Sequence, residues 1–213
     1  MCAGIRWGVL VIKQYQQQDV DIQSECLEAD GFFKLKKLRL RHRLFSGTWS
    51  EVFEREMCVR GDAVGVLLYD PQLQQFALVE QLRIGVLHRK QSPWLLEIVA
   101  GMLDKPDEDC QAVAIREAEE EANLSVQALE PISRYFCSPG GSTEFFTLFC
   151  GRVDLSAAKE GVFGLDEEHE DIRLHILSVE KVLTLLSDGT INNAMSIIAL
   201  QWFQLHRARL DAL

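Results

Sequence analysis

The sequence predicts an α/β fold, in which helices cover both faces of a mixed β-sheet and a small antiparallel sheet comes first. Alternating apolar and polar residues dominate residues 20–59, and apolar runs separated by turn residues follow from residue 62. Helical periodicity marks residues 108–124 and the segment after residue 178. We therefore divide the chain into an N-terminal antiparallel β domain, residues 1–60, and a main α/β domain, residues 61–213.

The composition is typical of a globular protein: 213 residues, 47% hydrophobic and 25% charged. No apolar run approaches the roughly 18 residues of a membrane span, so we expect no membrane partner. The net charge of −10 argues against a nucleic-acid partner, because binding phosphates requires basic patches. Six cysteines are scattered without a Cys-x-x-Cys pair. This pattern predicts reduced thiols and a cytoplasmic location rather than a zinc site or disulfides.

The N-terminal domain shows three strand-like segments after a lead of weak pattern over residues 1–18. The alternating segments are 19–23, 33–44 and 49–57, and Gly31 and Ser46-Gly47 mark the turns between them. Three strands with one apolar face are marginally stable alone. We therefore expect this sheet to pack against another surface.

The main domain begins at Asp62 with apolar strands. Predicted strands occupy residues 63–69, 75–83, 93–101, 134–137, 144–150 and 173–177. Two helices follow: the first begins at Ser178 and stops at Asp188-Gly189, and the second is capped by Asn192 or Asn193 and continues through Leu205. The wide apolar face of the last helix is explained by core packing without any cofactor.

Acidic residues are concentrated in two segments, 104–121 and 166–171, which hold thirteen of the 32 acids. In the first segment Glu117, Glu120 and Glu121 share one helical face, and Glu119 points the other way. Like charges at this spacing destabilise an isolated helix by roughly 0.2–0.5 kcal/mol per pair. Such a face is either solvated or filled by a cation, and a hard cation such as Mg²⁺ prefers carboxylate oxygens beside substrate phosphates.

The segment from Gly101 to Leu124 resembles the Nudix box, whose pattern is Gly-x5-Glu-x7-Arg-Glu-apolar-x-Glu-Glu-x-Gly-apolar. Gly101 matches the first position, Arg116-Glu117 the central pair, Glu120-Glu121 the closing acids and Leu124 the last position. Two departures stand out. The first gap is one residue longer, so that Glu108 takes the first acid position, and Asn123 replaces the second Gly. Asn is the next best residue for the left-handed conformation that ends a helix, so we expect it to cap the helix.

The resemblance implies a Nudix-type α/β/α sandwich and Mg²⁺-dependent cleavage of a pyrophosphate bond, with Mn²⁺ as the alternative metal. Pro139 stands fifteen positions after Leu124, and a proline about that far past the box marks the ADP-ribose branch of the family. We therefore expect hydrolysis of ADP-ribose to AMP and ribose 5-phosphate. The alternatives are a pyrophosphatase for another nucleoside diphosphate sugar, such as a GDP-sugar, and a Nudix module that binds nucleotides without turnover.

The resemblance also implies roles for individual residues. The metal ligands are expected to be the Ala100 carbonyl and the carboxylates of Glu117, Glu120, Glu121 and Glu170. Glu168 is the candidate catalytic base, and Arg116 is expected to orient the glutamates. Glu97 is a lone acid in an apolar run, and it needs a partner, for which Arg116 and the metal are the candidates.

Substrate contacts are expected from two parts of the chain. Arg83 ends an apolar strand, where it either grips phosphate or is a surface charge. Arg55 is either close to substrate, as in the matching branch, or a solvent-facing strand residue, and Pro139 and Gly140 lie in a loop that the branch places at the site. That branch pairs its N-terminal sheets in a homodimer, in which Phe32 or Phe33 could stack on the partner's adenine.

Overall fold

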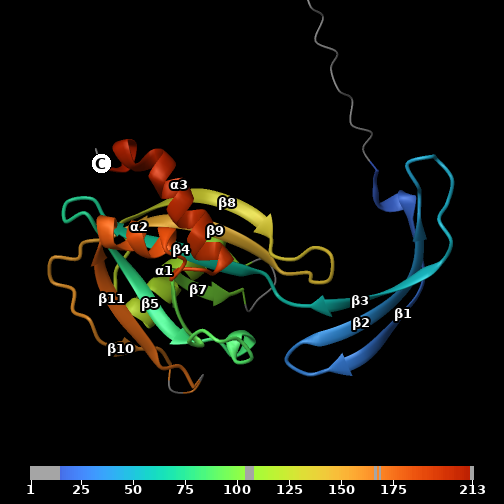
Figure 1. Ribbon diagram of the computed structural model, residues 1–213, viewed down its shortest axis with the longest axis horizontal. Coiled ribbons are helices and arrows are strands. Elements are labelled where there is room, and N and C mark those ends of the chain that lie inside the picture. Colours follow the sequence, from blue (N-terminus) through green and yellow to red (C-terminus); the bar gives the residue numbers. More distant parts are fainter. Residues whose placement is uncertain (1–14, 104–107, 166, 168, 212–213) are drawn as a thin grey trace, which may run out of the picture. The chain divides into compact units, whose positions relative to one another are not determined.

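The computed structural model describes residues 15–103, 108–165, 167 and 169–211. Contacts divide the chain into one unit that ends at Val59 and a second that begins at Arg60, and both are drawn in Figure 1. Among the described residues, no helix is long and apolar enough to cross a membrane.

The first unit is a three-stranded antiparallel sheet, which follows a short 3-10 helix, η1 (Gln17–Asp19). Its strands are β1 (Val20–Asp30), β2 (Lys34–His42) and β3 (Phe53–Val59), in that order across the sheet. Ion pairs join neighbouring strands, for example Arg41 with Asp21 at 2.8 Å and Lys37 with Glu54 at 3.3 Å. The three predicted strands are confirmed, and β1 runs seven residues further than expected, to Asp30.

The second unit is built on an eight-stranded mixed sheet. Six strands form the order β10-β11-β5-β4-β9-β8, while β6 pairs with β5 and β7 pairs with β4. The strands are β4 (Ala63–Asp70), β5 (Gln75–Leu82), β6 (Trp94–Glu97), β7 (Val99–Met102), β8 (Ala128–Phe136), β9 (Phe145–Arg152), β10 (Val162–Phe163) and β11 (Ile172–Ser178). Only the pairing of β4 with β9 is parallel among those described.

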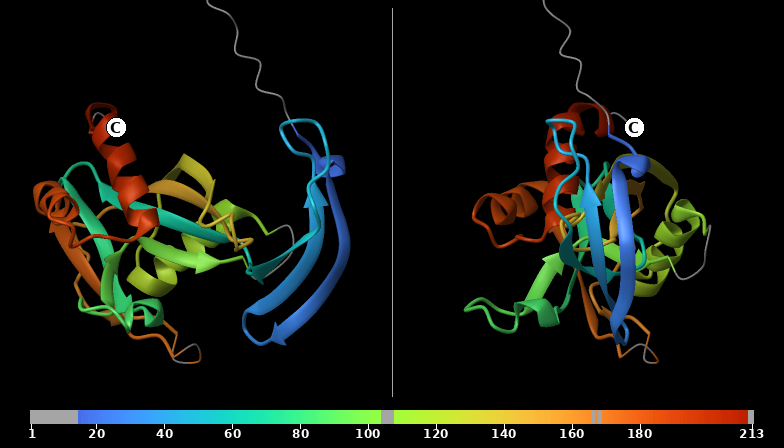
Figure 2. Two further views of the ribbon diagram at one scale, coloured as in Figure 1. Left: turned by 45° about the vertical axis from the view of Figure 1, so that its right-hand side comes forward. Right: turned by 90° about the vertical axis from the view of Figure 1, so that its right-hand side faces the viewer.

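Helices cover both faces of this sheet, so the predicted fold class is confirmed. A core on one face packs α1 (Cys110–Ala122) against β4, β5 and β11, and a second core packs α2 (Val179–Ser187) and α3 (Ala194–Leu210) on the other face. The right-hand view of Figure 2 shows α1 and α2 on opposite sides of the strands. A short 3-10 helix, η2 (Ile84–Val86), follows β5.

The strand predicted over residues 93–101 is wrong in one respect, because it is broken at Ile98. Glu97 pairs with Val79 of β5, whereas Val99 pairs with Val66 of β4. The segment therefore crosses from one strand to the next where β4 and β5 diverge. Sequence alternation does not reveal this change of partner, since both halves of the segment are equally apolar.

Candidate active site

The acidic helix α1 has well-defined ends. The Asp109 carboxylate accepts a hydrogen bond from the Gln111 amide at 3.1 Å and so caps the first turn. Asn123 ends the helix with φ 51°, and its amide donates to the Glu119 carbonyl at 2.9 Å. The expectation that Asn123 replaces glycine as the left-handed cap is confirmed.

The glutamates of α1 differ in exposure as their helical phase predicts. Glu121 is 2% exposed, whereas Glu119 lies in solvent. The side chains of Glu117 and Glu120 are intermediate, 13% and 27% exposed. Three carboxylates therefore belong to the side of the helix that faces the protein, and one belongs to its outer surface.

Glu121 is the most strongly perturbed of these carboxylates. Burial raises its pKa to about 8, even though the Ala100 amide donates a hydrogen bond to its Oε2 at 3.2 Å and so favours the charged form. The negative charges of Glu117 and Glu170 raise its pKa further, while Arg83 lowers it. The carboxylates of Glu117 and Glu121 on α1 and of Glu170 before β11 are therefore close enough to interact electrostatically, and Glu121 lies where little water reaches.

Arg116 and Gly101 hold Glu117 in place. Arg116 donates to the carboxylates of Glu117 at 3.0 Å and Glu120 at 3.1 Å. A Cβ atom at Gly101 would lie 2.0 Å from the Glu117 carboxyl group, so the glycine leaves the space that this side chain occupies. The first glycine of the box is therefore required by close approach rather than by backbone conformation.

Arg83 and Glu97 form an ion pair beside these carboxylates. Arg83 Nε donates to Glu97 Oε2 at 2.6 Å, and the Glu97 side chain is only 4% exposed. Burial raises the pKa of Glu97, and Arg83 opposes this effect. The expected partners of Glu97 were Arg116 or a metal; the structure pairs Glu97 with Arg83, and Arg116 instead pairs with Glu117 and Glu120. The pair forms because β6 lies beside β5, a pairing that the pattern of neither strand specifies.

The segment that carries Glu170 is tied to the end of α1. The Gly164 amide donates to the Glu120 carbonyl at 3.3 Å, and the Leu165 amide donates to Glu170 Oε2 at 3.1 Å. Gly164 has φ +103°, and a Cβ atom there would lie 2.6 Å from Glu170 Cβ. Sequence reasoning missed Gly164, although a glycine beside an acidic run can indicate such a close approach. The predicted base, Glu168, lies outside the described residues.

Pro139 and Gly140 lie in an exposed turn between β8 and β9. The Ser138 carbonyl accepts hydrogen bonds from the amides of Gly141 at 3.1 Å and Ser142 at 2.9 Å, which closes this turn.

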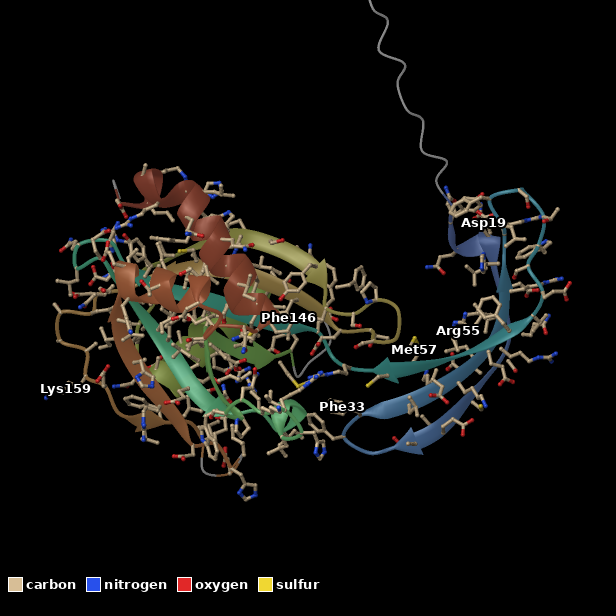
Figure 3. All side chains as sticks on the ribbon, in the orientation of Figure 1. Asp19, Phe33, Arg55, Met57, Phe146 and Lys159 are labelled. Atoms are coloured by element: carbon tan, nitrogen blue, oxygen red, sulfur yellow. The ribbon has the colours of Figure 1, made fainter. Side chains whose placement is uncertain are left out.

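Arg55 and Phe33 belong to the N-terminal unit. Figure 3 shows Arg55 and Met57 projecting from β3, and Phe33 in the turn that joins β1 to β2. Arg55 lies over the Phe53 ring, 4.5 Å from its centroid, and Phe33 contacts Phe32 edge to face. Both of these contacts are made within the N-terminal unit.

The residues present fit a hard divalent cation. Within the described ranges, no three His, Cys, Asp or Glu residues form a ready-made metal cage. Mg²⁺ does not require one, because it keeps several waters and is commonly held by one or two carboxylates and substrate phosphates. Glu117 and Glu170 repel the charged form of buried Glu121, and a bound cation would neutralise the negative charge of these carboxylates.

A family model described as the NUDIX domain matches residues 59–212, which include the acidic helix and all of the main sheet. The chain belongs to the Nudix family. Relatives named ADP-ribose pyrophosphatase in Haemophilus influenzae and Escherichia coli are each 42% identical to this Nudix protein. The matches cover 94% and 92% of this chain, and 93% of each relative.

Two further comparisons place this Nudix protein more broadly. A relative in Yersinia pestis named GDP-mannose pyrophosphatase is 30% identical over 87% of this chain and 91% of its own length. The crystal structure of an ADP compounds hydrolase has a TM-score of 0.68 and 18% identity, and the match covers 92% of this chain and 98% of the other. At that identity the structural match supports the fold alone.

Proposed function

We propose that this protein hydrolyses the pyrophosphate bond of ADP-ribose, releasing AMP and ribose 5-phosphate, with Mg²⁺ as cofactor. One observation carries the proposal. The buried Glu121 carboxylate lies close enough to Glu117, Glu170 and Arg83 to interact electrostatically with all three. The near-full-length relatives named ADP-ribose pyrophosphatase support the choice of substrate.

Charge is the main obstacle to this reaction, because water must attack phosphorus past anionic oxygens. Glu117, Glu120, Glu121 and Glu170, with the Ala100 carbonyl, would hold Mg²⁺, or Mn²⁺ as an alternative. When bound, the cation supplies neutralisation of phosphate charge and acidification of the attacking water.

The chain's own groups provide orientation and proton transfer. Arg116 fixes the positions of Glu117 and Glu120 through its two ion pairs. Arg83, held by Glu97 yet 39% exposed, would contact a phosphate of the substrate. Glu168 would accept the proton of the water as a new P–O bond forms and the bridging P–O bond breaks, which releases one phosphate ester as the leaving group.

A substrate panel tests this function. The purified protein is incubated with Mg²⁺ and ADP-ribose, GDP-mannose or a UDP-sugar, and released AMP, GMP or UMP is quantified by chromatography. We expect AMP to form fastest. Faster GMP release would assign the protein to GDP-sugars, a possibility raised by the Yersinia pestis relative. Tight calorimetric binding of ADP-ribose without any AMP released over hours would identify a nucleotide-sensing module.

We further propose that the protein is a cytoplasmic homodimer paired through its N-terminal sheets. No described residue of that unit is buried, and one face of its sheet carries most of its apolar side chains, together with Glu25, Lys36 and Arg55. Register places Ile22, Leu40 and Phe53 side by side on this face, and Leu27, Leu38 and Met57 share it. Covering this face with a second copy removes the apolar area from water, and it is the arrangement in which Phe33 and Arg55 would reach the partner's substrate.

A further inference from the structure

The first turn of α3 is bonded to the backbone of the broken strand that leads into the site. The Ile98 amide donates to Ser196 Oγ at 3.0 Å, and Asn193 Nδ2 donates to the Leu96 carbonyl at 3.0 Å. We call these two contacts the α3 clamp. Ser196 is 1% exposed, and Ile98 is fully buried. Both contacts join residues almost a hundred positions apart in the sequence.

The clamp lies at the point where the strand changes partner. Glu97 pairs with β5 and Val99 pairs with β4, so Ile98 between them pairs with neither strand. A buried amide without a partner is costly, and the Ser196 hydroxyl supplies the missing acceptor for Ile98. The clamp therefore stabilises the break itself, not simply the packing of α3.

The residues on either side of the break reach the proposed site. Successive side chains of a strand point to opposite faces, and Ile98 packs in the core of α2 and α3 whereas Val99 packs in the core of α1. On that second face Glu97 holds Arg83 at 2.6 Å. Two residues beyond the break, the Ala100 amide donates to Glu121 at 3.2 Å.

We propose that Asn193 and Ser196 are positioning residues for the reaction, which act through the break at Ile98. By fixing where β6 ends and β7 begins, the clamp sets the spacing between the Arg83–Glu97 pair and the Glu121 carboxylate. This inference rests on the proposed hydrolase function, because it assigns Arg83 to substrate and Glu121 to the metal. A misplacement of about 1 Å between such groups can lower a rate about 100-fold.

A substitution at Asn193 can remove its contact in the α3 clamp while keeping its role as the helix cap. Its Oδ1 accepts from the Ser196 amide at 3.1 Å, which caps α3, while its Nδ2 donates to Leu96. Asn193→Ser keeps a good capping residue and removes the amide donor, so we expect this variant to fold. Ser196→Ala removes the acceptor for Ile98. The matched control is Asn192→Ser, because exposed Asn192 contacts Gln91 at 3.3 Å and lies outside the clamp.

The test combines kinetics with hydrogen exchange on the full-length protein. With ADP-ribose and saturating Mg²⁺, well below the unfolding temperature, kcat should fall about 10- to 100-fold in Asn193→Ser and Ser196→Ala and remain unchanged in Asn192→Ser. Amide exchange over residues 94–100 should accelerate in both clamp variants, with residues 35–41 of β2 in the N-terminal unit as the internal reference. This second measurement requires neither metal nor turnover.

Two outcomes would overturn the inference. One is wild-type kcat in folded Asn193→Ser and Ser196→Ala, whatever their unfolding temperatures, which would make the contacts structural only. The other is unchanged exchange over residues 94–100 in variants with reduced kcat, which would place the effect elsewhere. If the wild-type protein hydrolyses no nucleoside diphosphate sugar, the proposed function fails, whereas the exchange experiment still reports whether the clamp fixes the break.

Discussion

The Ala100 amide and the Glu121 carboxylate are joined by a hydrogen bond of 3.2 Å that connects β7 to α1. This contact holds a buried acid, raised in pKa to about 8, directly against the strand that enters the acidic helix. Substituting Glu121 by Gln keeps the size of the side chain and its capacity for hydrogen bonding, but removes the negative charge that Glu121 would present to a bound cation. Turnover of ADP-ribose should fall at least about 100-fold, because metal-assisted charge neutralisation is worth several kcal/mol.

The control for this substitution is Glu119→Gln on the exposed side of the same helix. It should leave kcat within about two-fold of wild type, since an exposed charge in high dielectric contributes little. Circular dichroism should show both variants folded. Equal losses of activity in the two variants would refute the assignment of one helical face to the metal.

Gly101→Ala tests the close approach of β7 to Glu117. The new methyl group would overlap the Glu117 carboxyl group, which must then leave its place beside Arg116. We expect kcat to fall about 10- to 100-fold and the Mg²⁺ concentration for half-maximal rate to rise. Gly85→Ala serves as the control, because a Cβ there meets nothing within 4 Å. Wild-type kinetics in Gly101→Ala would show that Glu117 has room to move without consequence.

Activity lost by substituting Glu168 or Glu170 should be restored by different conditions. Glu168→Gln removes the proposed base, so kcat should fall within the range of about 10²–10⁴-fold, with ADP-ribose affinity nearly unchanged and partial recovery at higher pH. Glu170→Gln removes a proposed metal ligand, so added Mg²⁺ should restore part of its rate. Steady-state kinetics against pH and Mg²⁺ distinguish the two. The roles are reversed if metal rescues the first variant and alkali the second.

The apolar face of the N-terminal sheet should hold the dimer together. Leu40→Glu places a charge between Ile22 and Phe53 on that face, so it should shift the protein from dimer to monomer in multi-angle light scattering at micromolar concentration. Glu54→Gln, on the opposite face, should leave the mass unchanged. A fully active wild-type monomer under these conditions would remove the homodimer and its shared site.

The ion pair between Glu130 of β8 and Arg209 of α3 predicts a pH-dependent contribution to stability. Arg209 donates to both Glu130 oxygens, at 2.8 and 2.5 Å, and lowers the pKa of this carboxyl group. A lowered folded-state pKa contributes stability above the unfolded-state value, about 4.3, and this contribution is lost as pH falls through the folded value. Glu130→Gln should therefore lower the thermal midpoint at pH 7, by the equivalent of at most about 1 kcal/mol, and by less at pH 3. An equal difference at both pH values would refute the role of charge.

The sequence was sufficient to predict the parts of the structure that depend on local pattern. The phase of Glu117, Glu120 and Glu121 on α1 and the left-handed cap at Asn123 follow from residue type and spacing, and both are confirmed. The alternation of β1 to β3 and the two C-terminal helices were predictable for the same reason.

The features that depend on pairing between distant segments were not predictable. The partner of Glu97 is set by the register that brings β6 beside β5, which no periodicity encodes. The first half of β8 was missed because Pro131 interrupts its pattern, and a proline is tolerated there since β8 is an edge strand with a register shift at that residue. The break at Ile98 depends on α3, whose first turn contacts it from 98 positions away.

That separation has a consequence for biosynthesis. A nascent chain carries all of the proposed metal ligands once residue 170 has been translated, yet Ile98 still lacks its hydrogen-bond acceptor, Ser196. Because domains fold as units while ribosomes add about 5–20 residues per second, the ligands precede their final geometry by seconds. Ile98 thus gains its hydrogen-bond acceptor only after every proposed metal ligand has been translated.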